Sequence, residues 1–233
     1  MLATMNNSPV RVLLVGAAGR MGKTVFDLAQ NDREIEIVAR CDLGDPIEQA
    51  MKNCDVAIDF SHANAIDDIC RAASQHAKPL VIGATGHSPQ QSRIIEETAH
   101  SVPVVFASNF SVGVNVLFSL ARKAAELLDS DFRAEIVETH HKMKKDAPSG
   151  TAKTLAEILQ AGRKGERAIP IQSIREGDIV GEHSVIFSGP AERLELTHRA
   201  TSREIFARGA LRAVKWIVHK PPGRYSMQDV LGL

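Results

Sequence analysis

The sequence predicts an α/β fold in two parts, a doubly wound parallel sheet and a second, α+β domain with an open mixed sheet. Apolar, β-branched runs alternate with helical patterns in the first half of the chain, which is typical of strands buried on both faces of a parallel sheet. The alternation of short strands and helices ends at Asn109, and a long helical pattern follows. A later segment alternates apolar and polar residues, which indicates a sheet with one face in water.

The first part is predicted to contain short strands joined by helices. An apolar strand at 10–16 ends in a glycine turn, and the helix at 22–30 carries Val25, Leu28 and Ala29 at helical spacing. Short connections between parallel strands imply right-handed crossovers. The remaining predicted elements are strands at 35–41, 56–60, 80–83 and 102–107 and helices at 65–76 and 88–100.

The second part is predicted to begin with one long helix at 111–128. The charged, glycine-containing stretch 163–181 is predicted to be irregular and mobile. A final helix near 204–219 precedes a tail at 221–233. The other predicted elements are strands at 134–139, 184–188 and 192–200 and a helix at 151–160.

Composition excludes several classes of function. Lys plus Arg and Asp plus Glu both total 28, so no net charge attracts nucleic acid or an anionic membrane, and neither is expected as a partner. No run reaches the roughly 18 apolar residues of a membrane span, and the first residues lack the pattern of a signal peptide. Cys41, Cys54 and Cys70 form no CxxC pair, which favours reduced thiols. We therefore expect a cytoplasmic protein.

Three glycines follow the first predicted strand, at Gly16, Gly19 and Gly22. Glycine permits a tight turn and a close approach of the backbone to a diphosphate, which would lie at the start of the next helix. Asp42 follows Gly22 by 20 residues, at the end of the second strand, where a carboxylate binds a ribose hydroxyl in Rossmann-type domains. The alternative is a plain glycine turn with a surface aspartate, but the joint context favours a dinucleotide site.

A second glycine turn, GATG at 83–86, follows another apolar strand. The carboxyl ends of parallel strands face the ligand crevice, so this loop could present backbone groups to a nicotinamide. Taken alone, it is typical of an ordinary turn.

The segment 138–151 is the densest polar cluster in the chain and contains two histidines and three lysines. Lysine supplies charge for a carboxylate, and histidine exchanges a proton near neutral pH, so the cluster suits an anionic substrate. Ser149, Gly150 and Thr151 open the next helix and provide a second anion site. His140 and His141 would point to opposite faces of a continued strand and should have different roles.

The alternative interpretation of this cluster is a basic, solvated loop followed by an ordinary N-cap. No metal is expected, since the chain has no HExxH motif and no cysteine near these histidines.

The segment ETHHKMKKDAPSGTA at 138–152 resembles the dihydrodipicolinate reductase family, whose pattern ExHHxxKxDxPSGTA it matches at every defined position. The resemblance covers nearly the whole chain. It extends to VGAAGRMG at 15–22, IDFS at 58–61, GATG at 83–86, ASNFSVGVN at 107–115 and ERLELTHRATSR at 192–203.

The resemblance implies an NAD(P)H-dependent reduction of an unsaturated cyclic imine dicarboxylate to tetrahydrodipicolinate by a homotetramer. It implies a dinucleotide-binding domain at 1–110 and 204–233 and a substrate-binding and oligomerisation domain at 111–203. His140 would donate a proton with help from Lys144, which would also bind substrate. His141 would bind one carboxylate, and Ser149, Gly150 and Thr151 another. Cofactor contacts would fall on Gly16, Gly19, Arg20, Met21, Gly22, Asp42, Gly83, Thr85, Ala107, Asn109 and Phe110.

Three departures from the family pattern concern the cofactor. Leu43 follows Asp42 where members that use NADPH often have arginine, which favours NADH, although Arg40 could compensate. His62 follows IDFS where many relatives have arginine. The connection 43–54 is shorter than usual, which predicts a more open adenine side.

Two other functions remain open from the sequence. One is a different two-domain nicotinamide-dependent dehydrogenase, acting on aspartate or an amino-acid semialdehyde. The other is a regulator that senses nucleotides without turnover.

Overall fold

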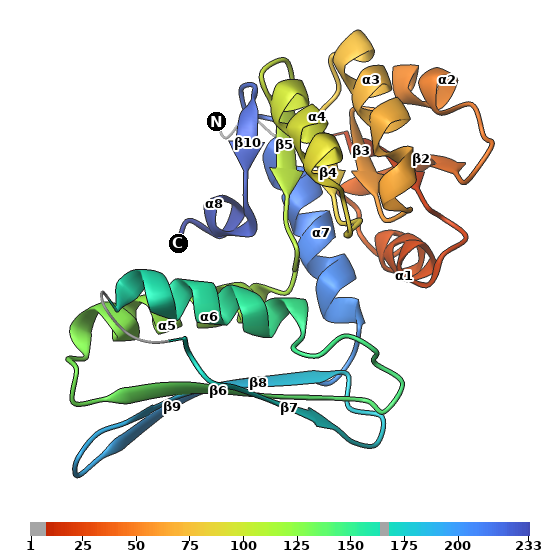
Figure 1. Cartoon of the computed structure of the whole chain (residues 1–233). Coiled ribbons are helices and arrows are strands. Elements are labelled where there is room, and N and C mark those ends of the chain that lie inside the picture. Colours follow the sequence, from red (N-terminus) through yellow and green to blue (C-terminus); the bar gives the residue numbers. More distant parts are fainter. Residues whose placement is uncertain (1–7, 164–167) are drawn as a thin grey trace, which may run out of the picture. The chain divides into compact units, whose positions relative to one another are not determined.

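A computed structural model describes residues 8–163 and 168–233, which divide into two compact units (Figure 1). The first unit comprises Met1–Phe110 with Phe206–Gly232, and the second comprises Ser111–Ile205. Each unit has its own sheet and its own hydrophobic core.

The sheet of the first unit has six strands in the order β10-β5-β4-β3-β1-β2, and every neighbouring pair is parallel. The predicted doubly wound fold is therefore confirmed. Its strands are β1 (Val10–Val15), β2 (Ile35–Cys41), β3 (Val56–Asp59), β4 (Leu80–Ile82), β5 (Pro103–Phe106) and β10 (Gly223–Tyr225).

Helices cover both faces of this sheet, as central strands buried on both faces require (Figure 1). Val12 and Leu14 of β1 belong to a core with helices α1 and α7, while Leu13 and Val15 face a core with α3 and α4. Full burial of each such aliphatic side chain contributes about 1.5–3 kcal/mol. The helices are α1 (Arg20–Ala29), α2 (Ile47–Lys52), α3 (Ile66–His76), α4 (Pro89–Ala99), α7 (Glu204–Ile217) and α8 (Met227–Leu231), with a 3-10 turn η1 at Ala63–Ala65.

The second unit is a four-stranded mixed sheet in the order β7-β6-β8-β9. β6 is parallel to β7 and antiparallel to β8, and β8 is antiparallel to β9. Helices α5 and α6 lie on one face of this sheet (Figure 1). The elements are α5 (Val112–Leu127), β6 (Arg133–His140), α6 (Gly150–Gly162), β7 (Ile171–Arg175), β8 (Gly181–Ser188) and β9 (Arg193–Ala200).

The prediction of an irregular stretch at 163–181 is wrong for Ile171–Arg175, which forms strand β7; residues 164–167 lie outside the described residues. This short strand lies at the edge of the sheet and is only partly buried, so its sequence lacks a clear apolar pattern. Pairing with β6 holds it in place.

The tail at 221–233 and the connection 43–54 also contain regular structure that the sequence analysis missed, namely β10, α8 and α2. A capping box does precede α8, since Ser226 accepts from the backbone N–H of Asp229, whose carboxylate accepts from the N–H of Ser226.

Candidate active site

The glycine turn of the first unit packs so closely against neighbouring backbone that it has no room for a side chain. Gly16 has a φ of +81°, and a Cβ there would lie 2.6 Å from the backbone carbonyl carbon of Phe60. A Cβ on Gly22 would lie 2.1 Å from the carbonyl oxygen of Gly16. Helix α1 begins at Arg20 with Gly19 in the N-cap position, which provides no side-chain cap for the first N–H groups. This arrangement fits the diphosphate of a dinucleotide.

Asp42 lies beside the same turn. Its two carboxylate oxygens are 3.1 and 3.0 Å from the backbone nitrogen of Ala18, and its own N–H donates to the Asp45 carboxylate at 2.8 Å. The neighbouring Leu43 is fully exposed. The guanidinium of Arg40 lies 4.7 Å from the ring centre of Phe26, a cation–π contact that holds it over α1.

The second glycine turn follows β4. The N–H groups of Gly83 and Ala84 donate to the carbonyl of Asp59 at 2.8 and 3.1 Å, and Thr85 beyond them is exposed. A Cβ on Gly83 would lie 2.3 Å from the ring of Phe60, so a larger residue here would have to displace this ring. The turn is therefore held tightly against the end of β3.

The other predicted cofactor contacts lie after β5. Ala107 and Asn109 are partly buried, whereas the side chain of Phe110 is in the core, with its ring edge-on to Phe60 at 6.0 Å. His62 caps the η1 turn by accepting at Nδ1 from the Asn64 N–H at 3.3 Å. This residue, which departs from the family pattern, thus has a structural role.

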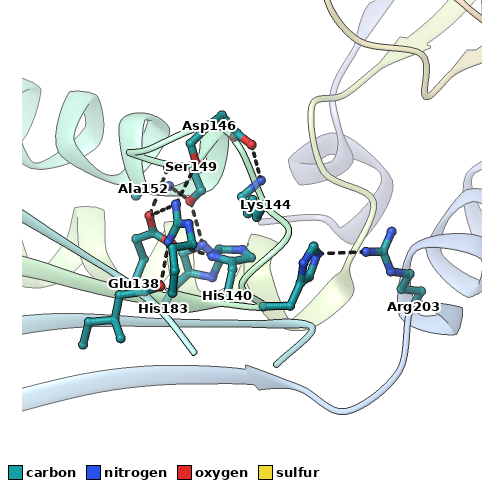
Figure 2. A network of polar contacts seen from close by, with 11 residues as sticks. Glu138, His140, Lys144, Asp146, Ser149, Ala152, His183 and Arg203 are labelled. Carbon is teal, nitrogen blue, oxygen red and sulfur yellow. Dashed lines mark hydrogen bonds and ion pairs between the residues drawn. The ribbon is translucent and has the colours of Figure 1, made fainter. Parts of the chain in front are cut away.

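The second unit brings together a buried polar network at the end of β6 (Figure 2). Glu138 and His140 are two residues apart on the strand, so both face the side covered by α5 and α6. Glu138 is completely buried, and its carboxylate accepts a hydrogen bond from Nδ1 of His140. Arg175 of β7 donates to the two carboxylate oxygens of Glu138 at 3.0 and 2.8 Å.

The network fixes the charge of its members. Burial alone would raise the pKa of Glu138, but hydrogen bonds from Arg175, Ser173 and His140 outweigh it and lower the pKa to about 2. Burial lowers the pKa of His140, and the adjacent Glu138 opposes this shift. Glu138 is therefore a carboxylate at neutral pH, and Nδ1 of His140 carries the hydrogen that it accepts.

His183 of β8 completes the network. Its ring lies edge-on to that of His140 with centres 5.0 Å apart, and its Nε2 is 3.1 Å from the Oγ of Ser149. Burial, reinforced by the nearby His140, lowers the pKa of His183 to about 4, so this histidine is neutral at physiological pH. Ser149 Oγ also accepts from the Ala152 N–H at 3.2 Å, which makes Ser149 the N-cap of α6.

Lys144 and His141, both predicted to bind substrate, have different surroundings. The ammonium of Lys144 is 2.8 Å from the Asp146 carboxylate, and this bond lowers the pKa of Asp146. His141 is only partly buried, and its Nε2 is 3.2 Å from a guanidinium nitrogen of Arg203. Strand β6 ends at His140, so His141 lies beyond it, and the two adjacent histidines have separate partners.

The start of α6 remains accessible next to this network. Gly150 is exposed, and a Cβ there would meet nothing within 4 Å, while Thr151 is partly buried. The side chain of Ser149, by contrast, is buried and already hydrogen-bonded. Any anion at this helix start would meet the backbone of Gly150 and Thr151 more readily than the hydroxyl of Ser149.

Four residues of the site were given no site role by the sequence analysis. Glu138 carried a usable signal, because it precedes His140 by two residues on a predicted strand. Arg175 lay in the stretch predicted to be irregular, and His183 and Arg203 reach the site only through strand pairing and chain folding. Sequence spacing cannot reveal such partners.

Within the described parts of the chain, Glu138, His140 and His183 form a group with potential metal-ligand atoms within 4.8 Å of one another. Their atoms are already engaged, however. Both oxygens of Glu138 bind Arg175, and His183 contacts Ser149. The guanidinium beside Glu138 also opposes a second cation, so the geometry is that of a hydrogen-bonded network.

Known proteins resemble this chain over nearly its full length. The family model described as "Dihydrodipicolinate reductase, N-terminus" matches residues 10–110, and the model for the C-terminus of the same family matches residues 113–231. A protein of Akkermansia muciniphila named 4-hydroxy-tetrahydrodipicolinate reductase is 45% identical over 96% of this chain and 98% of its own length. A protein of the same name from Aquifex aeolicus is 43% identical over 96% and 99%.

A solved structure has the same fold. The dipicolinate-bound dihydrodipicolinate reductase of Paenisporosarcina sp. TG-14 matches with a TM-score of 0.79 at 22% identity, over 95% of this chain and 98% of that one. Among residues 8–163 and 168–233, no helix has the length and apolar character needed to cross a membrane.

Proposed function

The chain belongs to the dihydrodipicolinate reductase family and is a 4-hydroxy-tetrahydrodipicolinate reductase of lysine and diaminopimelate biosynthesis, and from this premise we propose which residues carry the reaction. The matches favour this reductase over the dehydrogenase and regulator alternatives. The single observation that carries the assignment of roles is the buried Glu138–His140 pair at the end of β6, beside Lys144 and the start of α6.

The reaction needs a hydride and a proton. Reduced nicotinamide, when bound, supplies the hydride, and the substrate is an unsaturated cyclic imine dicarboxylate. Hydride addition to the conjugated imine leaves negative charge on the ring system, which a general acid neutralises by donating a proton. The protein must therefore hold two carboxylates and place an acid next to the ring.

His140 is the proposed acid. Because Nδ1 donates to the Glu138 carboxylate, Nε2 is the nitrogen that exchanges the proton with substrate. Gly181 packs against this side of the ring, and a Cβ there would crowd Nε2 at 3.0 Å. The donating form is the imidazolium. It loses the Nε2 hydrogen to the substrate and keeps the Nδ1 hydrogen, which it continues to donate to the Glu138 carboxylate.

Two groups of residues are proposed to bind the carboxylates. Lys144 supplies a positive charge four residues beyond His140, and the backbone N–H groups of Gly150 and Thr151 lie at the start of α6. Arg203, hydrogen-bonded to His141, adds a second cation. Ser149 contributes as the N-cap that holds α6 in place.

NADH is the proposed preferred cofactor. The turn at Gly16 and Gly22 fits the diphosphate, and Asp42 beside it suits ribose hydroxyls while repelling a 2′-phosphate. Leu43 offers no charge to that phosphate, and the guanidinium of Arg40 is held over Phe26.

A homotetramer in the cytoplasm is also proposed. The face of the second sheet opposite α5 and α6 presents the partly exposed Val137 and Ile174 among hydroxyl and charged side chains, which suits contact with a second copy of this sheet. All three cysteines are buried free thiols, as expected of a protein made in a reducing compartment. Sedimentation equilibrium of the purified protein would measure the assembly.

Steady-state kinetics with NADH and NADPH in parallel test the proposed function. The substrate is generated in situ, and the loss of reduced-nicotinamide absorbance is followed. We expect turnover with both cofactors and a higher kcat/KM with NADH. Absence of turnover with either would contradict the reductase function, and a higher kcat/KM with NADPH would contradict the cofactor assignment alone.

A further inference from the structure

We propose that Glu138 and Arg175 act together as positioning residues that decide which nitrogen of His140 exchanges its proton and how firmly that proton is held. The inference rests on the proposed role of His140 as the acid. Neither residue is proposed to contact substrate, and both act on the reaction through His140.

The geometry of strands β6 and β7 creates the arrangement. The two strands are parallel, and their register places Ser173 opposite Glu138 and Arg175 opposite His140. From that place the guanidinium reaches back to Glu138 and donates one hydrogen bond to each carboxylate oxygen, at 3.0 and 2.8 Å. The plane of the carboxylate is thereby fixed, and with it the direction in which Oε2 accepts from His140.

The same pair also holds the loop between β6 and α6. Arg175 donates to the backbone carbonyl of Asp146 at 2.6 Å, and Glu138 accepts from the backbone N–H of Ser149 at 3.3 Å. Lys144 lies on this loop, and its ammonium binds the side chain of Asp146. One ion pair thus sets the position of the acid and of the proposed carboxylate-binding lysine together.

Charge around His140 comes from four elements. Glu138 on β6 favours its protonated form, whereas Arg175 on β7 and Lys144 on the following loop disfavour it. His183 on β8 is neutral above a pH of about 4, as its own lowered pKa shows, and adds little charge in the working range. The carboxylate and the guanidinium therefore act on His140 with opposite signs.

An ordinary buried ion pair would give a different pattern. Losing such a pair would destabilise the fold and lower kcat and kcat/KM at every pH. It would not shift the pH dependence of kcat/KM in a direction set by the charge that is removed. The proposed role predicts opposite movements for the two partners. The imidazolium is the donor, so activity falls as pH rises through the pKa of His140. Removing Glu138 lowers that pKa, and removing Arg175 raises it.

The test compares Glu138→Gln, Arg175→Met and the double variant, using the pH dependence of kcat/KM with saturating NADH. In Glu138→Gln we expect the descending limb to move to lower pH by about one unit or more, with activity recovered on the acid side. In Arg175→Met it should move to higher pH. The double variant leaves no unpaired buried charge, so it should fold even if a single variant does not, and its limb should lie between those of the single variants.

A matched control is Glu182→Gln. Glu182 is also paired with an arginine, Arg199, at 2.7 and 2.8 Å, but this pair is solvent-exposed and makes no contact with His140. The descending limb of the Glu182→Gln profile should lie at the same pH as that of the unaltered protein. Movement of the limb in the same direction in both single variants, or in neither, would overturn the proposal.

Nitrogen NMR of the histidine rings keeps this proposal separable from the role of His140 in turnover. In the unaltered protein without substrate, the neutral His140 ring should carry its hydrogen on Nδ1. In Glu138→Gln the two tautomers should mix, because an amide both donates and accepts. An unchanged Nδ1–H tautomer in that variant would overturn the positioning role. Full activity of a His140→Gln variant would instead contradict the proposed acid and leave the tautomer result as evidence on positioning.

Discussion

Nε2 of His141 lies 3.2 Å from a guanidinium nitrogen of Arg203, a contact between residues 62 positions apart in the chain. Because a guanidinium only donates, the imidazole nitrogen must accept and carries no hydrogen of its own. The positive charge at this place therefore belongs to Arg203. A substrate carboxylate next to His141 would draw its charge–charge attraction from the arginine.

Replacing Arg203 should weaken substrate binding selectively. We expect Arg203→Gln to raise KM for the cyclic imine by about tenfold or more, since a charge-assisted hydrogen bond contributes roughly 1.5–3 kcal/mol. Arg203→Lys should recover part of the loss. The dissociation constant of NADH, from fluorescence titration, should not change. An unaltered KM would remove Arg203 from the substrate site.

Lys144 and Asp146 should differ in their effects although they are ion-paired. Lys144→Ala should lower kcat and raise KM, because it removes a charge from substrate and from the neighbourhood of the acid. Asp146→Asn should change KM by less than about threefold, since an exposed pair contributes only about 0–1 kcal/mol. Steady-state kinetics of the two variants side by side test this. A Lys144→Ala defect confined to NADH affinity would contradict the assignment.

Position 43 should tune cofactor choice. Leu43→Arg places a guanidinium next to Asp42, where it can reach a 2′-phosphate, so kcat/KM with NADPH should rise by about tenfold. The rate with NADH should change little. Leu43→Gln serves as the control for the size of the side chain without its charge. Equal responses of the two variants would show that charge at this position is not what selects the cofactor.

The glycine turn should tolerate no side chain. Gly16→Ala combines a φ of +81° with a Cβ 2.6 Å from backbone atoms of residues 60 and 61, so the turn must move. NADH binding measured by calorimetry should fall by at least about tenfold. Gly44→Ala is a matched control, since Gly44 has a φ of +93° but open space around it. Comparable losses of NADH affinity in both variants would mean that backbone strain alone is responsible, and not the close packing of the Gly16 turn.

Sequence patterns predicted most of the first unit because its strands are buried on both faces. Runs such as 12–15 and 56–58 are apolar without interruption, and no tertiary information is needed to recognise them. Strand β7, in contrast, is partly buried and polar in places, and it becomes a strand only because β6 pairs with it. The short β10 likewise depends on β5.

The site was predictable where its residues are neighbours in sequence. His140, Lys144 and the start of α6 lie within one segment, so spacing and residue type identify them together. Arg175 and His183 lie on other strands, and only the register of the sheet brings them to Glu138 and His140. The Ser149 hydroxyl caps α6 and contacts His183, and its predicted contact with a substrate carboxylate stays a prediction.

The central claim is that His140 donates the proton that accompanies hydride transfer. The most direct measurement is the single-turnover rate of NADH oxidation by a His140→Gln variant saturated with NADH and substrate, with the NADH dissociation constant measured on the same protein. The account predicts a rate lower by about 100-fold or more and an unchanged dissociation constant. A single-turnover rate equal to that of the unaltered protein would contradict it.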